Sequence, residues 1–256
     1  MSFRTFDYSN VRQISIDHFG SGSITIEPGT LEDTVEGSLN ATDEAFLSAI
    51  EVRQDRDHLR IEMPNRPFRG STAHLRLSVP PELSYDISSG SADISITADV
   101  GRAKITSGSG DVHLPGAGDL ECGTGSGDIA VGRLHGGSAR LTTGSGDVVI
   151  DEAHGPVHAK SGSGDLLIRS LLSDLRANSG SGDISVPSTL GSVDLRSASG
   201  SITVGVADDL PAWLDLNSVS GDIRITIEPS GEPAPGEPFV SIRARTASGE
   251  IAVYRA

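Results

Sequence analysis

A tetrapeptide of the form Gly-Ser-Gly-Asp, or a near relative of it, recurs through the middle of the chain. Successive aspartates of this motif are 18, 17, 19, 18 and 18 residues apart. A fixed period of this length is typical of repeat proteins in which each repeat adds one coil to a stack. Ser201, Asp222 and Glu250 continue the series less regularly. The aspartates stand at Asp93, Asp111, Asp128, Asp147, Asp165 and Asp183.

Apolar and polar residues alternate on both sides of each aspartate, as in a half-buried β-strand. Around Asp165, for example, the apolar residues are Val157 and Ala159 on one side and Leu166 and Ile168 on the other. The alternation changes parity inside Gly-Ser-Gly, so this tripeptide is predicted to be a corner between two sheets that keep their apolar sides inward. The pattern therefore predicts an all-β fold, a parallel β-solenoid of about 18 residues per coil, with aliphatic rows as its core.

The corner itself has a recurring chemistry. Its glycines are expected to use backbone conformations with positive φ, which are open to glycine at little steric cost. A small hydroxyl residue stands four positions before each aspartate and is expected to point inward and hydrogen-bond a backbone group. These residues are Ser107, Thr124, Thr143, Ser161, Ser179 and Ser197.

The two ends lack the strict repeat, and the chain is predicted to be one domain over residues 1–256. Irregular coils and a cap are expected over 1–85, regular repeats over 86–204, and C-terminal coils and a cap over 205–256, with a Pro/Gly-rich loop at 228–238. A short capped helix is predicted at 42–49. The ten aromatic residues all lie before residue 86 or after residue 212, where they are expected to fill and cover the ends. Five strand segments are predicted near the N-terminus, at Ile14–Ile16, Ser23–Ile26, Ile50–Val52, Leu59–Glu62 and Leu75–Val79.

Charge and cysteine content exclude several classes of protein. A formal net charge of −15 argues against nucleic-acid binding, which depends on clustered basic residues. The single cysteine, Cys122, cannot form an intramolecular disulfide and occupies an inward position. No apolar run of transmembrane length and no secretory leader are seen, so the chain as given is expected to be cytoplasmic, although a trimmed exported chain would look the same.

Several segments together resemble a known family. They are AHLRLSVPPELSYDISSGSADISI (73–96), the serial GSGD corners, LDLNSVSGDIRI (214–225) and RTASGEIAVYR (245–255). The chain is similar in these to the bacterial putative-adhesin family of β-strand-repeat domains of unknown function. The resemblance covers nearly the whole chain and implies a parallel β-solenoid. It implies no catalytic residues, because the family has no established chemistry.

The most conspicuous candidate site is the acidic column formed by the six repeat aspartates. In stacked coils their carboxylates would lie about 4.8 Å apart and repel one another by roughly 1–4 kcal/mol. The preferred account is that each accepts hydrogen bonds from backbone N–H groups at its corner, as in an Asx-turn. The sharper account is a ladder of divalent-cation sites, with calcium as the cofactor. Calcium-binding β-rolls of the RTX type carry a different nonapeptide motif twice per coil, and calcium favours six to eight oxygen ligands. The metal-site candidates are Asp93, Asp111, Asp128, Asp147, Asp165 and Asp183.

Three functions remain open from the sequence. The preferred one is a non-catalytic interaction module, a rigid acidic solenoid whose faces bind a protein or a cell-envelope component, with no nucleic-acid partner. A calcium-binding solenoid is the second. A polysaccharide-cleaving β-helix enzyme is the third, and the scarcity of aromatic platforms for sugar rings counts against it. The histidines, among them His113, His135, His154 and His158, are expected to be solvated at the surface.

Overall fold

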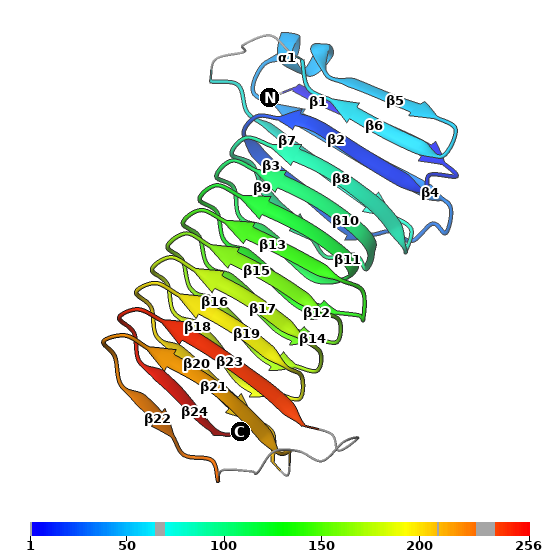
Figure 1. Ribbon diagram of the computed structural model, residues 1–256. Helices are drawn as coiled ribbons and strands as arrows, with labels where there is room; N and C mark the ends of the chain where they lie inside the picture. The colour runs from blue at the N-terminus through cyan, green and yellow to red at the C-terminus, as the bar shows by residue number, and fades with distance from the viewer. Residues whose placement is uncertain (1, 65–69, 209, 229–238) are drawn as a thin grey trace. The chain divides into compact units, whose positions relative to one another are not determined.

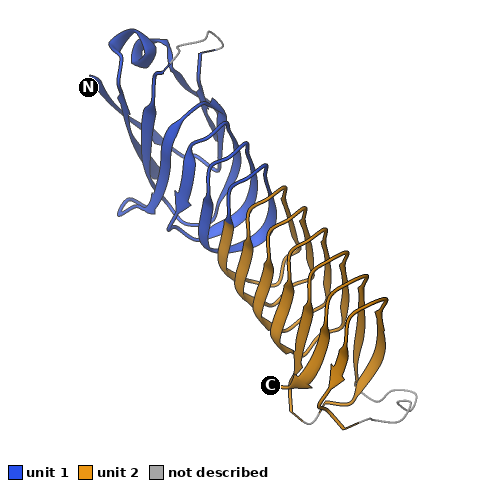
Figure 2. Cartoon of the chain, turned by 90° about the vertical axis from the view of Figure 1, so that its left-hand side faces the viewer, with its two compact units in different colours: residues 1–128 blue, residues 129–256 orange. Residues whose placement is uncertain are grey.

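The chain folds as a parallel β-solenoid, as the repeat predicts (Figure 1). The computed structural model describes residues 2–64, 70–208, 210–228 and 239–256. This described part contains 24 strands and one short helix. The chain divides into two compact units, residues 1–128 (unit 1) and 129–256 (unit 2), which Figure 2 colours separately. That the chain behaves as one domain stays a prediction.

Unit 1 combines stacked parallel strands with an antiparallel cap. The parallel pairs are β6–β2–β8–β10–β11 in one sheet and β7–β3–β9–β11 in the other. The cap consists of β1 against β4, β4 against β7 and β5 against β6, all antiparallel. The elements are β1 (Ser2–Ser9), β2 (Gln13–Phe19), β3 (Gly22–Pro28), β4 (Thr34–Ala41), α1 (Glu44–Ala49), β5 (Glu51–Asp55), β6 (His58–Glu62), β7 (Ala73–Val79), β8 (Leu83–Ser89), β9 (Asp93–Ile96), β10 (Val100–Ser107) and β11 (Val112–Thr124).

The predicted N-terminal elements are present in unit 1. All five predicted strand segments coincide with or overlap β2, β3, β5, β6 and β7. The helix α1 is capped by Asp43, whose Oδ1 accepts a hydrogen bond from the backbone N–H of Phe46 at 3.0 Å. A capping carboxylate satisfies one of the free N–H groups of the first turn, so this short helix begins where the sequence indicates.

Unit 2 contains two parallel sheets joined by the Gly-Ser-Gly corners. The first sheet has the order β13–β15–β17–β19–β23–β21, and the second has the order β12–β14–β16–β18–β20–β24–β22. The strands are β12 (Ile129–Leu134), β13 (Ala139–Thr143), β14 (Val148–Ala153), β15 (Val157–Ser161), β16 (Leu166–Leu171), β17 (Leu175–Ser179), β18 (Ile184–Thr189), β19 (Val193–Ser197), β20 (Ile202–Val206), β21 (Ala212–Ser218), β22 (Ile223–Ile225), β23 (Val240–Thr246) and β24 (Ile251–Arg255).

The last coil in the sequence is not the last coil in the stack. Strand β23 pairs with both β19 and β21, and β24 pairs with both β20 and β22. The corners therefore follow the spatial order Ser201, Glu250, Asp222: Ile202 N–H donates to Glu250 O at 2.8 Å, and Ile251 N–H donates to Asp222 O at 2.9 Å. The order of these three corners in the stack thus differs from their order in the sequence. Inserting the final coil gives both of its strands two paired edges, whereas a terminal coil would leave one edge of each open.

The core consists of aliphatic rows in register across the coils, as predicted. In the second sheet of unit 2, Val148, Leu166, Ile184 and Ile202 are in register and fully buried. Burying each such side chain contributes roughly 1.5–3 kcal/mol. In unit 1 the thiol of Cys122 also points inward, and its burial raises the pKa to about 12. A thiol in this state is a packing group rather than a nucleophile.

The inward hydroxyl groups close the corners as predicted. Each accepts a hydrogen bond from the backbone N–H three residues later, for example Ser161 Oγ from Gly164 at 2.8 Å and Thr124 Oγ1 from Gly127 at 2.9 Å. The same bond forms at Ser107, Thr143, Ser179 and Ser197. A buried N–H without a partner costs about 1–3 kcal/mol, so the recurring spacing of hydroxyl and glycine has a direct energetic reason.

The prediction that the corner glycines use positive φ is wrong. Among the described glycines, positive φ occurs at Gly22, Gly70 and Gly136, and at no glycine of a Gly-Ser-Gly-Asp corner. The corner glycines are required by close approach instead. A Cβ placed on Gly164 would overlap the carbonyl oxygen of Gly146 in the preceding coil, and one on Gly182 would overlap that of Gly164. The corner requires glycine because there is no room for a Cβ, and not because the backbone adopts the left-handed conformation.

The aromatic residues only partly fill the ends. Phe19, Phe46 and Tyr85 are buried in unit 1, as expected. Phe3, Trp213 and Phe239 are instead exposed, with Trp213 42% accessible. Ring size alone cannot distinguish an inward strand position from an outward one, and Trp213 occupies an outward position in β21.

Candidate functional site

The acidic column is tied to the backbone of the next coil. In unit 2 the N–H of Asp165 donates to Oδ1 of Asp147 and the N–H of Asp183 donates to Oδ1 of Asp165, both at 2.8 Å. Asp183 Oδ1 accepts from the N–H of Ser201 at 2.7 Å. Each carboxylate therefore links two successive coils, whereas the predicted Asx-turn would have kept the bond within one corner.

The same contact occurs in unit 1. Asp93 Oδ1 accepts from the N–H of Asp111 at 3.1 Å, and Asp111 Oδ1 accepts from Asp128 at 2.9 Å. Charge-assisted bonds of this kind stabilise a carboxylate and partly offset the repulsion along the column. Over the described ranges of the chain, no three His, Cys, Asp or Glu side chains come close enough together to hold a metal ion. Calcium binding by Asp93, Asp111, Asp128, Asp147, Asp165 and Asp183 stays a prediction.

Replacing Asp165 separates its two properties, charge and hydrogen bonding. Asp165→Asn keeps an oxygen that can accept the Asp183 N–H and removes one charge from the column. We expect its free energy of unfolding, measured with urea, to equal or exceed that of the parent chain by up to about 1 kcal/mol. Asp165→Ala loses the acceptor and is expected to be less stable by about 1 kcal/mol. A saturable rise of the parent's melting temperature with calcium that disappears in Asp165→Asn would support the cation ladder instead.

The outward side of the first sheet of unit 2 is basic, although the chain as a whole is acidic. Strands β13, β15, β17, β19, β23 and β21 present six Lys or Arg side chains and only two carboxylates there, a formal surplus of four positive charges. Because the strands pair in register, these side chains form two rows that cross the strands. We call this surface the cationic face, and it comprises Arg140, His158, Lys160, Arg176, Arg196, Arg243 and Arg245.

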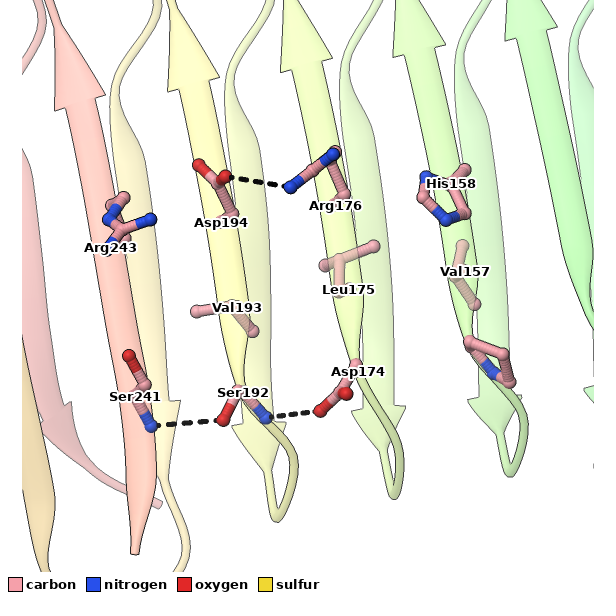
Figure 3. A pocket seen from close by; sticks show the side chains of 11 residues that line it. Val157, His158, Asp174, Leu175, Arg176, Ser192, Val193, Asp194, Ser241 and Arg243 are labelled. Atoms are coloured by element: carbon pink, nitrogen blue, oxygen red, sulfur yellow. Dashed lines mark hydrogen bonds and ion pairs between the residues drawn. The ribbon is translucent and has the colours of Figure 1, made fainter.

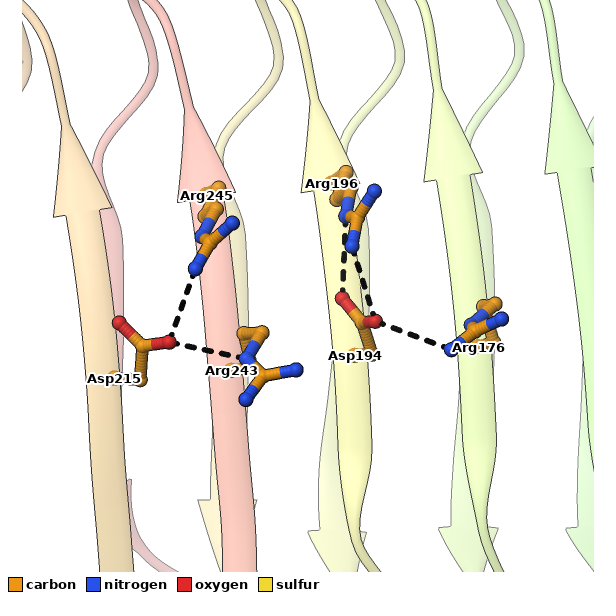
Figure 4. A network of polar contacts seen from close by, with 6 residues as sticks. All are labelled: Arg176, Asp194, Arg196, Asp215, Arg243 and Arg245. Atoms are coloured by element: carbon orange, nitrogen blue, oxygen red, sulfur yellow. Dashed lines mark hydrogen bonds and ion pairs between the residues drawn. The ribbon is translucent and has the colours of Figure 1, made fainter.

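Two carboxylates organise the arginines of the cationic face (Figure 4). Asp194 is held by Arg196 through two bonds of 3.2 Å and lies 3.6 Å from Arg176. Asp215 Oδ2 accepts from Arg243 Nε at 3.0 Å and from Arg245 at 3.1 Å. The hydrogen bond from Arg243, reinforced by Arg245, holds the pKa of Asp215 below its ordinary value. Each of the two carboxylates is thus shared by two guanidinium groups.

One of these two rows of outward side chains borders a hollow of ≈ 350 Å³ (Figure 3). His158, Arg176, Asp194 and Arg243 lie along one side of it. The other side is formed by residues at the start of the strands. Asp174 Oδ accepts from Ser192 N–H at 3.1 Å, and Ser192 Oγ accepts from Ser241 N–H at 3.2 Å.

Trp213 lies one strand beyond the residues that line this hollow. Trp213 in β21 is in register with Ser241 in β23, two positions before the aligned pair Asp215 and Arg243. Its side chain is 42% exposed and therefore accessible to a ligand. The site thus offers cations, carboxylate and hydroxyl oxygens, and an aromatic surface on one rigid sheet, which suits binding rather than bond cleavage.

The sequence contains a signal for this face in the spacing of its outward charged residues. Arg140, His158, Arg176 and Asp194 are each 18 residues apart, at the outward position after the first apolar residue of each strand. Histidines 113, 135, 154 and 158 are exposed, as predicted. His154 is not part of the cationic face: it follows β14 in the other sheet, where its Nε2 lies 2.7 Å from Oε1 of Glu152.

Comparison with known proteins gives matches over almost the whole chain. The model of the family described as Toastrack DUF4097 matches residues 11–254. No curated protein matches the chain. A solved structure of a putative adhesin from Parabacteroides distasonis is similar with a TM-score of 0.56 and 13% identity, over 100% of this chain and 97% of that chain. A putative lipid binding protein from the same organism has a TM-score of 0.53 and 17% identity, over 98% and 96%. At these identities the likeness shows the fold. Among the described residues, no helix has the length and apolarity needed to cross a bilayer.

Proposed function

We propose, from the premise that this chain belongs to the Toastrack DUF4097 family, that it is a non-catalytic interaction module whose flat outer sheet binds a cell-envelope component or an envelope protein. The family assignment agrees with the resemblance to putative-adhesin domains that the GSGD corners indicate. Two proteins of this fold are described as a putative adhesin and as a putative lipid binding protein, and both descriptions are binding roles.

The observation that carries this proposal is the cationic face. Six basic side chains gather on one side of a chain whose formal net charge is −15. Basic side chains gathered on one face of an acidic protein are explained by a binding surface for a ligand of negative charge. The regular parallel strands beneath it hold these side chains in fixed rows, which lowers the entropic cost of binding.

The proposal predicts binding without turnover. Labelled protein is mixed with a washed, insoluble bacterial envelope fraction and sedimented. We expect saturable retention that excess unlabelled protein displaces and that weakens as salt rises from low to physiological strength, because exposed charges are screened.

The supernatant of the same experiment is tested for newly released reducing sugar ends. We expect none above the level of the envelope alone. Release of sugar ends that Asp165→Asn abolishes would contradict the proposal and favour the polysaccharide-cleaving alternative. Absence of saturable retention would contradict it as well.

A further inference from the structure

We infer that the cationic face and the hollow beside Trp213 form a binding site for an acidic polysaccharide, a polymer whose sugar rings carry carboxylate groups. This inference rests on the proposed function and names the ligand class of the same surface. The polymer would lie across strands β15, β17, β19, β23 and β21, along the two rows of side chains.

Charge and exposure make the outermost layer of this face positive. The side chain of Asp194 is only 15% exposed, whereas Arg176 and Arg196 on either side of it are 62% and 53% exposed. Asp215 is likewise less exposed than Arg243 and Arg245. The carboxylates lie beneath the guanidinium groups and orient them, so an approaching ligand meets cations first. Guanidinium groups bind carboxylates through two parallel hydrogen bonds, which favours a carboxylate-bearing ligand.

One pair of arginines is unfavourable until an anion binds. Arg196 in β19 and Arg245 in β23 stand directly opposite each other in the paired strands. Like charges at such positions destabilise a sheet. Arg196 is bound to Asp194 and Arg245 to Asp215, so the two pairs share no carboxylate. A ligand carboxylate that binds both guanidinium groups would place a negative charge between them and reduce their mutual repulsion.

The hollow provides groups that a sugar ring uses besides its carboxylate. Ser192 and Ser241 are small, so they leave room at the start of the strands for a ring, and the Asp174 carboxylate lies at the same edge. Carboxylate and hydroxyl oxygens accept hydrogen bonds from sugar hydroxyl groups. The exposed indole of Trp213, one strand beyond Ser241, offers a flat apolar surface against which the C–H face of a ring can pack.

The mixture of groups favours a polysaccharide over other polyanions. Three carboxylates, those of Asp174, Asp194 and Asp215, lie among the cations. They can accept from hydroxyl groups, but they repel the closely spaced phosphates of a nucleic acid, whose binding depends on uninterrupted basic contacts. A membrane surface is matched less well, because Trp213 is the only large apolar side chain at an outward position of these strands, and interfacial binding scales with buried apolar area.

The test uses polygalacturonate as the acidic polymer and neutral dextran as its uncharged counterpart. Trp213 is the only tryptophan of the chain, so its fluorescence reports binding directly. We expect polygalacturonate to shift this fluorescence saturably at low salt and dextran to leave it unchanged. The double variant Arg196→Gln/Arg245→Gln should weaken binding about tenfold or more, since it removes two charge-assisted contacts.

The matched control removes two arginines of similar exposure from the other sheet, as Arg133→Gln/Arg169→Gln. It should bind polygalacturonate within about twofold of the parent chain, because surface charges that do not contact the ligand act only through screened fields. Equal weakening by both double variants would overturn the site, and so would equally tight binding of duplex DNA or of anionic phospholipid vesicles. If polygalacturonate does not bind while the envelope fraction still retains the protein, this inference fails and the proposed function stands. If neither polygalacturonate nor the envelope fraction binds the protein, both this inference and the proposed function fail.

Discussion

Gly164→Ala is expected to destabilise the chain by at least about 3 kcal/mol, at the upper end of what overpacking costs. The Cβ that this change adds would overlap the carbonyl group of Gly146 in the neighbouring coil. Backbone atoms cannot move aside as a flexible side chain can, so the two coils must separate. Separation also weakens the Asp165 N–H bond to Asp147 Oδ1, which joins the two coils. Urea unfolding followed by circular dichroism measures the loss.

Gly20→Ala serves as the control for this prediction. A Cβ at Gly20 meets no atom within 4 Å, and its φ is not in the left-handed region. We expect its free energy of unfolding to stay within about 0.5 kcal/mol of the parent value, as for other unconstrained surface changes. A Gly164→Ala protein as stable as Gly20→Ala would show that adjacent corners do not approach as closely as described.

Leu166→Ala should cost about 2–5 kcal/mol, the range measured for cavities left in well-packed cores. Leu166 is fully buried and stands between Val148 and Ile184 in the same inward row. Rows above and below are held by the strand ladder, so they cannot collapse fully into the space. The measurement is the midpoint and slope of urea unfolding. An unchanged slope shows that the surface exposed on unfolding is the same as in the parent chain.

The next residue of the same strand gives the matched control. Leu167 points to the opposite side of the sheet and is partly exposed. Leu167→Ala removes the same atoms, yet we expect it to cost less than about 1 kcal/mol because little buried area is lost. Equal costs at the two positions would contradict the assignment of inward and outward faces in β16.

The sequence predicts the repetitive part of this fold because every local preference there agrees. Around Asp165 the alternation, the corner glycine and the inward Ser161 each point to the same coil, and the structure contains all three features. The reason for the glycines was misjudged, since a clash between coils such as that at Gly164 is a contact between residues distant in sequence. Local composition shows that glycine is needed but not whether conformation or space requires it.

The order of the final coils and part of the candidate site were beyond sequence reasoning for the same physical cause. Nothing in residues 240–255 says that their strands insert between two earlier coils. Arg196 and Arg245 stand opposite each other only through that insertion, since it makes β23 rather than β21 the neighbour of β19. The 18-residue spacing of Arg140, His158 and Arg176 could have revealed half of the cationic face. The other half depends on pairing that the period does not determine.

Disulfide trapping between corners tests the stacking register most directly. Ser163 and Ser181 occupy equivalent exposed positions in successive corners, and equivalent Cα atoms of neighbouring coils lie about 4.8 Å apart. That separation falls within the range a disulfide can bridge, whereas the roughly 9.6 Å between Ser163 and Ser199, two coils away, does not. The native Cys122 is buried and is not expected to compete.

The two double variants are oxidised mildly and the cross-linked peptides are identified by mass spectrometry. Stacked coils predict rapid and nearly complete bridging in Ser163→Cys/Ser181→Cys and none in Ser163→Cys/Ser199→Cys. Bridging of the second pair, or its absence from the first, would contradict the in-register stack on which the rows of the cationic face depend.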